Sequence, residues 1–279
     1  MNEALRLEHI SKKYETFTLH DVNLVIPKGS IMGFIGENGA GKSTTMKAML
    51  GLIHPDGGEV YVDGKRFTGE ERGIKERLGV VTDSSCFPEE LNAVEIGNVM
   101  RRVYRTWDKK RYKGLLKEYK IDEKKRIREY SRGMKMKLSL VVALSHDSKL
   151  LVLDEATSGL DPVVRDSLLD TFLDFIQDEE HAIWLSSHIL SDLEKVCDYI
   201  TFIQDGRILF SENKDELIEK YRIVKGSRAQ LEQLESVIGL SENAFGAQAL
   251  VPSAQAPDGI ASDAAGIEDI MLFYGKERR

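Results

Sequence analysis

Long apolar runs and cysteines are both scarce in this sequence of 279 residues. No stretch approaches the roughly 18 apolar residues that a membrane-spanning helix requires, and the polar, charged first ten residues do not suit a signal peptide. The two cysteines, Cys86 and Cys197, lie far apart. This excludes a disulfide framework or a zinc pattern and indicates reduced thiols in a reducing compartment. Any membrane role is therefore expected to come through a partner protein.

An excess of basic residues is also lacking. Lys and Arg number 39 against 46 Asp and Glu, which gives a formal net charge of -7. Because nucleic-acid-binding proteins usually carry a basic excess, we expect no nucleic-acid partner. The rest of the composition, 42% hydrophobic and 30% charged, is typical of a globular protein with a sizeable core. The length suits one large α/β domain or two modest ones.

Strand and helix patterns alternate along most of the chain. Alternating apolar residues predict a half-buried strand at 22–26. Short apolar segments predict further strands at 31–35, 59–62, 78–81, 150–153 and 182–185, and a hairpin at 199–210. Helices are predicted at 42–52, 111–120 and 267–274, and after the Asp161-Pro162 cap. This alternation predicts an α/β fold with a mostly parallel sheet.

Two stretches break the alternation. Between about residues 84 and 137 the strand signals vanish and charged residues and tyrosines become dense, so we expect a helical insertion with one helix opening at Pro88. Trp107 within it suits either core packing or an interface anchor. Residues 246–266 are rich in Ala, Ser, Gly and Pro, which is typical of a linker or a weakly ordered loop.

A glycine-rich loop follows the strand predicted at 31–35. Its sequence, Gly36-Glu37-Asn38-Gly39-Ala40-Gly41-Lys42-Ser43-Thr44, matches the Walker A pattern between a strand and a helix. Backbone N–H groups and the helix N-terminus can hold phosphate oxygens here, because the glycines keep side chains out of the turn. Lys42 is expected to reach the β- and γ-phosphates of ATP, and Ser43 to offer its hydroxyl to Mg²⁺.

The strand predicted at 150–153 ends in two acids, Asp154 and Glu155. Ligands of open α/β sheets bind at the carboxyl ends of the strands, which is where these acids are expected. Asp154 suits a Walker B aspartate that holds Mg²⁺ through its water shell, and Glu155 suits a base that polarises an attacking water. Two acids alone could simply cap a strand in solvent. Beside the Walker A loop they indicate a P-loop NTPase.

Three further motifs accompany these two. They are Tyr130-Ser131-Arg132-Gly133-Met134, Ser158-Gly159-Leu160-Asp161 and Ser187-His188. In this order the chain resembles the nucleotide-binding subunit of ABC transporters over about residues 5–221. The resemblance implies a RecA-like P-loop NTPase core with an N-terminal antiparallel β-subdomain, a helical insertion subdomain and a short C-terminal extension. It also implies ATP and Mg²⁺ as cofactors.

The resemblance assigns roles to five residues. Tyr14 matches the aromatic residue that stacks on adenine. Ser131 and Gly133 match the signature positions that contact the γ-phosphate bound by the opposite subunit. Asp161 matches the loop aspartate that couples the two sites. His188 matches the switch histidine, which contacts the γ-phosphate and helps to hold the attacking water.

Three positions depart from the family pattern. Arg132 stands where the signature has its first glycine, and Met134 where it has glutamine. Where the family has a glutamine after the strand at 78–81, this chain has Thr82-Asp83. We expect Asp83 to serve the metal, since a carboxylate is a hard oxygen ligand.

The resemblance also implies an organisation and partners. It places one ABC domain at residues 1–221, its helical subdomain at about 84–137, and a small extension at 222–279. Two such domains, in a homodimer or with a related subunit, would face each other head to tail. An integral membrane permease would bind the helical insertion, with the chain peripheral on the cytoplasmic face of the cell membrane. The signature and the small tail look more like bacterial exporter-type ATPases than importers.

Two other functions stay open at this point. One is a soluble ABC-type ATPase that acts on DNA, ribosomes or protein complexes, although the chain has no basic stripe, long coiled coil or second ATPase domain. The other is a module that senses nucleotide without hydrolysing it, against which Glu155 and His188 argue.

Overall fold

A six-stranded, mostly parallel sheet forms the centre of the computed structural model, which describes residues 2–82, 87–234, 236–243, 246–257 and 260–276. The strand order is β10-β9-β3-β8-β7-β6. The strands are β3 (Ser30–Ile35), β6 (Leu78–Val81), β7 (Leu150–Asp154), β8 (Ala182–Ser186), β9 (Tyr199–Gln204) and β10 (Arg207–Asn213). All neighbours pair in parallel except β9 and β10, which form the predicted hairpin. The predicted α/β fold is confirmed.

Both faces of this sheet are buried. Successive side chains of a strand point to opposite sides, so each strand contributes residues to both hydrophobic clusters. In β3, Ile31 and Ile35 join one hydrophobic cluster, whereas Met32 and Phe34 join the other. In β8, Trp184 shares the cluster of Met32 and Phe34, and its ring lies 5.3 Å from that of Phe34. Burial on both faces explains why these strands read as nearly continuous apolar runs.

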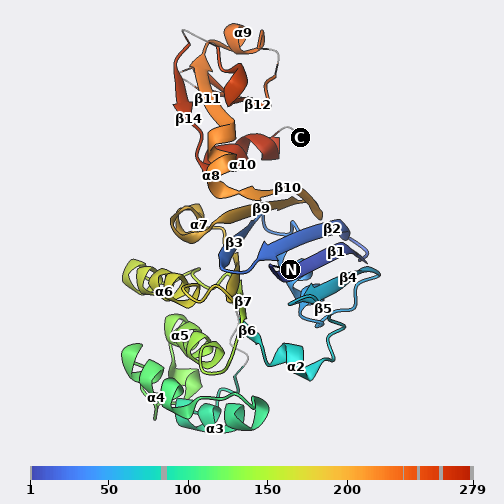
Figure 1. Cartoon of the computed structure of the whole chain (residues 1–279). Helices are drawn as coiled ribbons and strands as arrows, with labels where there is room; N and C mark the ends of the chain where they lie inside the picture. Colours follow the sequence, from blue (N-terminus) through green and yellow to red (C-terminus); the bar gives the residue numbers. More distant parts are fainter. Residues whose placement is uncertain (1, 83–86, 235, 244–245, 258–259, 277–279) are drawn as a thin grey trace.

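Helix α1 and a second sheet cover one face of the central sheet, and three other helices cover the opposite face (Figure 1). The second sheet is antiparallel, in the order β2-β1-β4-β5. Its strands are β1 (Glu3–Lys13), β2 (Thr18–Pro27), β4 (Gly57–Val62) and β5 (Lys65–Arg66). The helices are α1 (Lys42–Met49) on this side, and α5 (Arg132–Ala143), α6 (Pro162–Phe175) and α7 (Leu190–Val196) on the other.

The stretch between β6 and β7 is helical, as predicted. It contains α3 (Ala93–Val103), α4 (Lys109–Glu118), the short η1 (Ile127–Glu129) and α5, while a one-turn helix, α2 (Arg72–Lys75), precedes β6. The predicted helix start at Pro88 is wrong, because Asn92 caps α3. The Asn92 side chain accepts the Glu95 N–H (3.0 Å), and the Glu95 carboxylate accepts the Asn92 N–H (2.9 Å).

A small sheet follows the central one, so the linker expected at 246–266 is wrong. Its order is β12-β13-β11-β14, from β11 (Tyr221–Gly226), β12 (Gly239–Asn243), β13 (Gly246–Pro252) and β14 (Ser262–Ala264). The helical elements α8 (Lys214–Lys220), α9 (Arg228–Leu231) and η2 (Ser253–Gln255) accompany it. The alanines of β13, Ala247 and Ala249, are buried in the core of this sheet, although alanine and glycine carry little strand signal.

The helix predicted at 267–274 is confirmed as α10 (Ile267–Lys276), and it packs back toward the central sheet. Its residues Ile267, Ile270 and Phe273 belong to the same hydrophobic cluster as the helical face of that sheet. The Ile267 N–H donates to Glu194 Oε1 of α7 at 3.1 Å. Helix α10 therefore joins the small sheet to the larger body.

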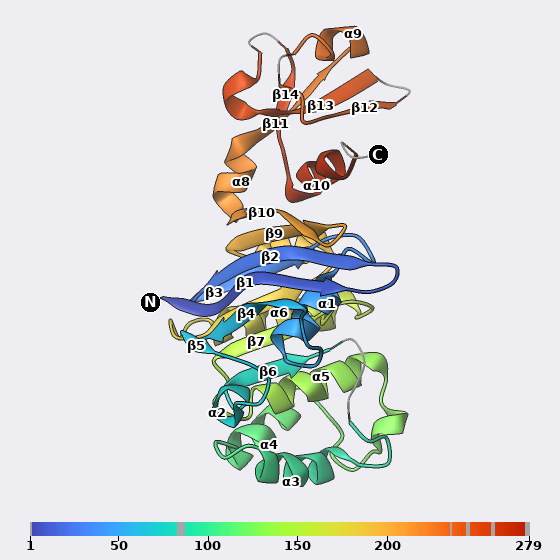
Figure 2. The same cartoon turned by 90° about the vertical axis from the view of Figure 1, so that its right-hand side faces the viewer.

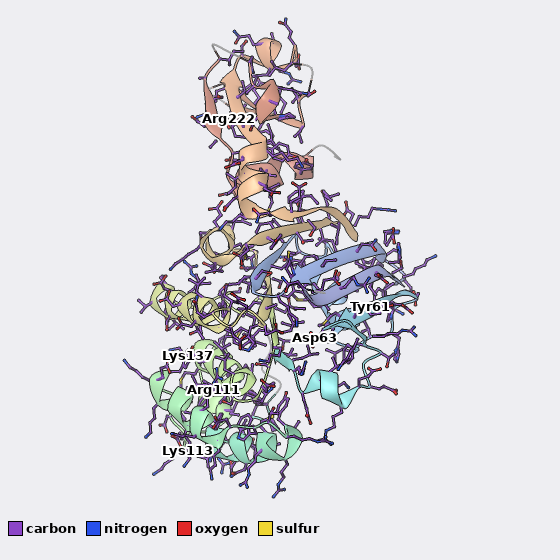
Figure 3. All side chains as sticks on the ribbon, in the orientation of Figure 1. Tyr61, Asp63, Arg111, Lys113, Lys137 and Arg222 are labelled. Atoms are coloured by element: carbon purple, nitrogen blue, oxygen red, sulfur yellow. The ribbon has the colours of Figure 1, made fainter. Side chains whose placement is uncertain are left out.

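The molecule is elongated, with the helical insertion at one end and the small sheet at the other (Figure 2). Arg111 and Lys113 of α4 lie at the helical end, and Arg222 of β11 lies at the opposite end (Figure 3). Within the described residues, no helix is long and apolar enough to cross a membrane.

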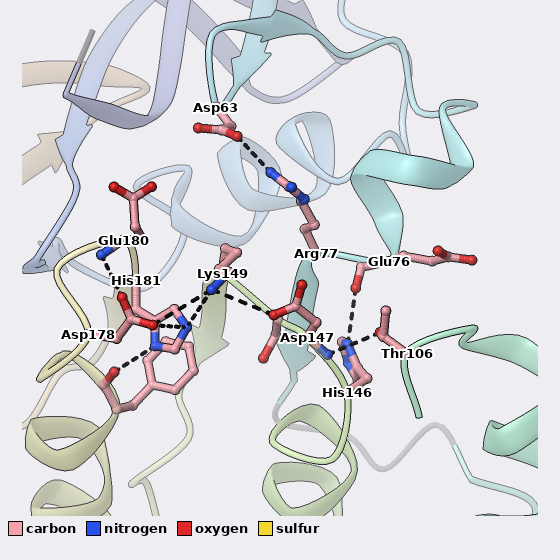
Figure 4. Close-up of polar contacts among 12 residues, drawn as sticks. Asp63, Glu76, Arg77, Thr106, His146, Asp147, Lys149, Asp178, Glu180 and His181 are labelled. Atoms are coloured by element: carbon pink, nitrogen blue, oxygen red, sulfur yellow. Dashed lines mark hydrogen bonds and ion pairs between the residues drawn. The ribbon is translucent and has the colours of Figure 1, made fainter. Parts of the chain in front are cut away.

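Polar contacts gather where the parallel strands begin (Figure 4). Arg77, just before β6, binds the Asp63 carboxylate at 2.7 Å, and Lys149, just before β7, lies 3.3 Å from His181 Nε2. His146 is 5% exposed, and its ring stacks on Tyr104 with the ring centres 3.9 Å apart. These contacts tie the helical insertion to the edge of the sheet opposite the carboxyl ends of the strands.

Candidate nucleotide-binding site

The glycine-rich loop joins β3 to α1 in a turn that excludes larger side chains. A Cβ at Gly36 would lie 2.3 Å from the carbonyl oxygen of Ile203. Gly41 has φ 114°, and a Cβ there would lie 2.9 Å from the ring of Phe17. Both positions therefore require glycine. The loop then opens into α1, whose first N–H groups have no partner within the helix and can bind an anion.

The other loop residues differ in exposure. Glu37, Asn38, Gly39 and Ser43 are exposed, Thr44 is half-buried and Ala40 is buried. The Ala40 N–H donates to the Glu37 carbonyl at 3.1 Å, which closes the turn.

Lys42 is folded into the loop and is 7% exposed. Its ammonium donates to the carbonyl oxygens of Gly36 (2.7 Å) and Glu37 (3.2 Å). Burial lowers the pKa of Lys42, and the negative charges of Glu155 and Asp154 act in the opposite direction. Because a buried cation is costly without an anion nearby, a phosphate bound in the loop would stabilise the charged form.

Asp154, the last residue of β7, and Glu155, which follows it, make different contacts. Asp154 Oδ1 accepts a hydrogen bond from the Ser186 hydroxyl at 2.6 Å. Glu155 Oε2 accepts one from His188 Nδ1–H, also at 2.6 Å, so the predicted base and the switch histidine are direct neighbours. The backbone of Glu155 is left-handed, with φ 54°. Such a conformation costs about 1–3 kcal/mol outside glycine and is concentrated at functional sites.

The oxygen ligands expected for Mg²⁺ lie together. Ser43 and Asp154 line the same cavity of about 340 Å³ beside the loop. No cluster of three or more His, Cys, Asp or Glu side chains able to hold a metal occurs in the described part of the chain. Mg²⁺ binds proteins through one or two hard oxygen ligands and takes its remaining ligands from phosphate and water, and the Ser43 hydroxyl and the Asp154 carboxylate are ligands of this kind. Asp83 lies outside the described residues.

The signature residues lie at the start of α5. Ser131 caps this helix, with its Oγ accepting the Met134 N–H at 3.2 Å. Gly133 faces Leu160, and the Arg132 guanidinium lies directly over Gly159. The signature therefore contacts the loop 158–161 of the same chain.

Asp161 ends that loop and caps α6, accepting the Val164 N–H at 3.0 Å. Its predicted cap role is confirmed. Tyr14 follows β1 and is 42% exposed, so it is not a buried strand residue. Its N–H donates to the Phe17 carbonyl at 2.7 Å, which fixes the short turn between β1 and β2.

Sequence patterns missed two residues of this site. Phe17 lies against Gly41 of the loop. Ser186 contacts both Asp154 and the backbone of Glu155. The only sequence signal for Ser186 is a second serine before Ser187-His188 at the end of an apolar strand.

Known proteins share this sequence pattern. A family model described as ABC transporter matches residues 19–158. The ABC transporter ATP-binding protein YtrB of Bacillus subtilis is 32% identical over 218 residues, covering 78% of this chain and 74% of YtrB. The bacitracin transport ATP-binding protein BcrA of Bacillus licheniformis is 30% identical, and the match covers 88% of this chain and 80% of BcrA. The lantibiotic transport ATP-binding protein SrtF of Streptococcus pyogenes is 33% identical, and the match covers 76% of this chain and 95% of SrtF.

Solved structures share the fold. The structure of an ATP-binding subunit of an ABC transporter matches with a TM-score of 0.71 and 28% identity, covering 77% of this chain and 91% of that one. The dimeric ATP-binding cassette MJ0796, bound to ADP and phosphate, matches with a TM-score of 0.67 at 20% identity, covering 75% and 98%. The chain therefore belongs to the ABC transporter family, as an ATP-binding subunit that hydrolyses ATP.

Proposed function

We propose that ATP is hydrolysed at sites shared by two ABC domains, and that this drives a membrane permease. The observation that carries the proposal is the direct pairing of Glu155 with His188 at the sheet edge that also holds Lys42. Each site would combine the Walker A loop of one domain with Ser131 and Gly133 of the other. The second domain would be another copy of this chain or a related subunit.

The chemistry follows from the positions of the side chains. Lys42 would turn from the carbonyls of its own loop to the β- and γ-phosphates of ATP. Glu155 would accept a hydrogen bond from the attacking water and orient it in line with the γ-phosphate, while His188 holds the glutamate and contacts that phosphate. Mg²⁺, held through Ser43 and Asp154, would offset phosphate charge when bound. Asp83 stays a candidate for the same metal.

The start of α5 suits a phosphate from outside its own chain. The Ser131 hydroxyl and the Gly133 N–H lie at an exposed helix N-terminus, where the helix dipole favours an anion. Asp161, in the adjoining loop, would link this surface to the chain's own catalytic acids. Tyr14 is proposed to stack on the adenine.

Exposed apolar side chains on two parts of the chain are candidate contacts for a permease. The cavity lined by Ser43 and Asp154 is also lined by Val80 and by Leu52, which is 66% exposed. Helix α3 adds three exposed valines, Val94, Val99 and Val103. The chain would then be peripheral on the cytoplasmic face of the membrane, where ATP is available.

We divide the chain into an ABC domain at 1–221, with its helical subdomain at about 84–137, and an extension at 222–279. The start of the small sheet at Tyr221 supports the first boundary. Helix α5, which begins within the helical subdomain, continues past its proposed end at about residue 137 to Ala143. The names of BcrA and SrtF favour transport of bacitracin or a lantibiotic as the permease's task.

Glu155→Gln tests this mechanism. The amide has the size of the carboxylate but cannot accept the proton of the water, so we expect phosphate release to fall at least 100-fold. ATP binding should persist, and ATP should convert the variant to a dimer in size-exclusion chromatography. Glu179→Gln, at an exposed glutamate before β8, is the matched control and should behave as the wild type.

The outcomes separate the alternatives. Unchanged phosphate release in Glu155→Gln would contradict the role of this residue. A variant that stays monomeric with ATP would contradict the shared site. Co-purification of the wild type with ribosomes, DNA or another macromolecular complex, rather than with a membrane protein, would favour the soluble ABC-type ATPase. Nucleotide binding without hydrolysis by the wild type would favour a nucleotide sensor.

A further inference from the structure

Ser186 is the last residue of β8 and lies directly beside Asp154 in the parallel register of β7 and β8. It is completely buried, with 0% of its surface exposed. A hydroxyl in such a place must find hydrogen-bond partners within the protein. Its partners are Asp154, the last residue of β7, and Glu155, which follows it.

The Ser186 hydroxyl bridges Asp154 and Glu155. It donates to Asp154 Oδ1 at 2.6 Å and accepts the Glu155 N–H at 3.1 Å. The same N–H lies 3.2 Å from the Ser186 carbonyl oxygen. One side chain thus fixes the carboxylate of the first acid and the backbone of the second.

The bridge acts where the chain is strained. Glu155 has the left-handed φ of 54°, which a non-glycine residue keeps only when its surroundings hold it there. Two acceptors from Ser186 face the Glu155 N–H. The turn at this residue sets the direction of its side chain toward His188.

We propose that Ser186 is a positioning residue for ATP hydrolysis. By holding Asp154 Oδ1, it fixes the orientation of the carboxylate that would hold Mg²⁺. By holding the Glu155 N–H, it keeps the base aimed at the attacking water. Ser186 acts through these two residues and does not touch the substrate. The inference rests on the roles proposed above for Asp154 and Glu155.

The test compares Ser186→Ala with Ser148→Ala. Ser148 is a buried serine at the opposite edge of the sheet, where its hydroxyl donates to the Ala143 carbonyl at 2.9 Å. Both variants lose one buried hydroxyl, but only the first loses the bridge. The first readout is Mn²⁺ affinity, measured by electron paramagnetic resonance with a non-hydrolysable ATP analogue, and so is independent of turnover.

We expect Ser186→Ala to bind Mn²⁺ about 10- to 100-fold more weakly, the usual effect of removing a group that orients a metal ligand. Its kcat should fall by a similar factor while KM for ATP changes little, because the Walker A loop is intact. Ser148→Ala should keep the wild-type Mn²⁺ affinity and kcat. Ser186→Thr and Ser186→Val, which have nearly the same shape, should differ from each other because only threonine keeps the hydroxyl.

Asp154→Asn separates failure of this inference from failure of the proposed function. Weakened Mn²⁺ binding in Asp154→Asn, with wild-type affinity and kcat in Ser186→Ala, would overturn the role of Ser186 alone. Unchanged affinity in both would overturn the metal role of Asp154 and the inference together. If the alanine variant does not fold, equal Mn²⁺ affinity and kcat in the threonine and valine variants would overturn the proposal.

Discussion

His146 makes the stability of this protein depend on pH in a way that can be measured. Its ring lies between the helical insertion and the sheet, stacked on Tyr104, with Nδ1 donating to the Glu76 carbonyl at 3.1 Å. Nε2 is buried and has no hydrogen-bond partner in the described structure. A proton added at Nε2 would therefore be a buried charge without an acceptor.

The size of the effect follows from the pKa of His146. Burial lowers this pKa from 6.5 to about 4, with smaller opposing contributions from the Glu76 carbonyl and Asp147. Between these two values the unfolded chain binds a proton that the folded chain does not, so the free energy of unfolding falls as the pH falls. The loss is about 2 kcal/mol by pH 5 and approaches about 3 kcal/mol below pH 4.

Urea denaturation of the wild type and His146→Phe at pH 7.5, 6.5, 5.5 and 5.0 tests this. Phenylalanine can keep the stack on Tyr104 but cannot be protonated. The variant also loses the hydrogen bond to the Glu76 carbonyl, which lowers its free energy of unfolding by the same amount at every pH. The wild type should therefore lose about 2 kcal/mol more than the variant between pH 7.5 and 5.0. The reasoning is refuted if both proteins lose stability in parallel over this range.

Two further predictions concern the Walker A loop. Lys42→Ala should weaken ATP binding about 10- to 100-fold, the value of a charged hydrogen bond to phosphate, in a fluorescence titration. Lys110→Ala, at an exposed position of α4 far from the loop, is its control, and equal affinities of the two variants would contradict the role of Lys42. Gly36→Ala would place a methyl group 2.3 Å from the Ile203 carbonyl oxygen. It should lower the free energy of unfolding by about 1–3 kcal/mol, and an unchanged urea midpoint would contradict that geometry.

The central sheet could be predicted from sequence because its strands are buried on both faces. Runs such as 31–35 and 150–153 have no polar interruption, and glycine or acidic residues end them abruptly. The nucleotide loop was equally predictable, since its glycines are required by backbone geometry. The residues within each segment are therefore enough to predict both features.

The small sheet could not be predicted in the same way. Its strand β13 buries alanines against neighbours distant in sequence, and such contacts leave no local periodicity. The start of α3 was misplaced because Pro88 and two acids look like a helix start, whereas the capping bonds of Asn92 and Glu95 determine it. Ser186 was missed for a related reason, because its importance comes from a neighbouring strand.

The return of α10 to the central body has a consequence for synthesis of the chain. The ring of Tyr274 lies 5.5 Å from that of Phe210 in β10, and Ile267 is bonded to α7. At 5–20 residues per second, a ribosome needs roughly 3–13 seconds to proceed from the end of β10 to the end of α10. During that interval the apolar surface around Phe210 lacks its cover. The nascent ATPase thus still exposes this apolar surface after its catalytic motifs have all been made, and a chaperone that binds it would act late in translation.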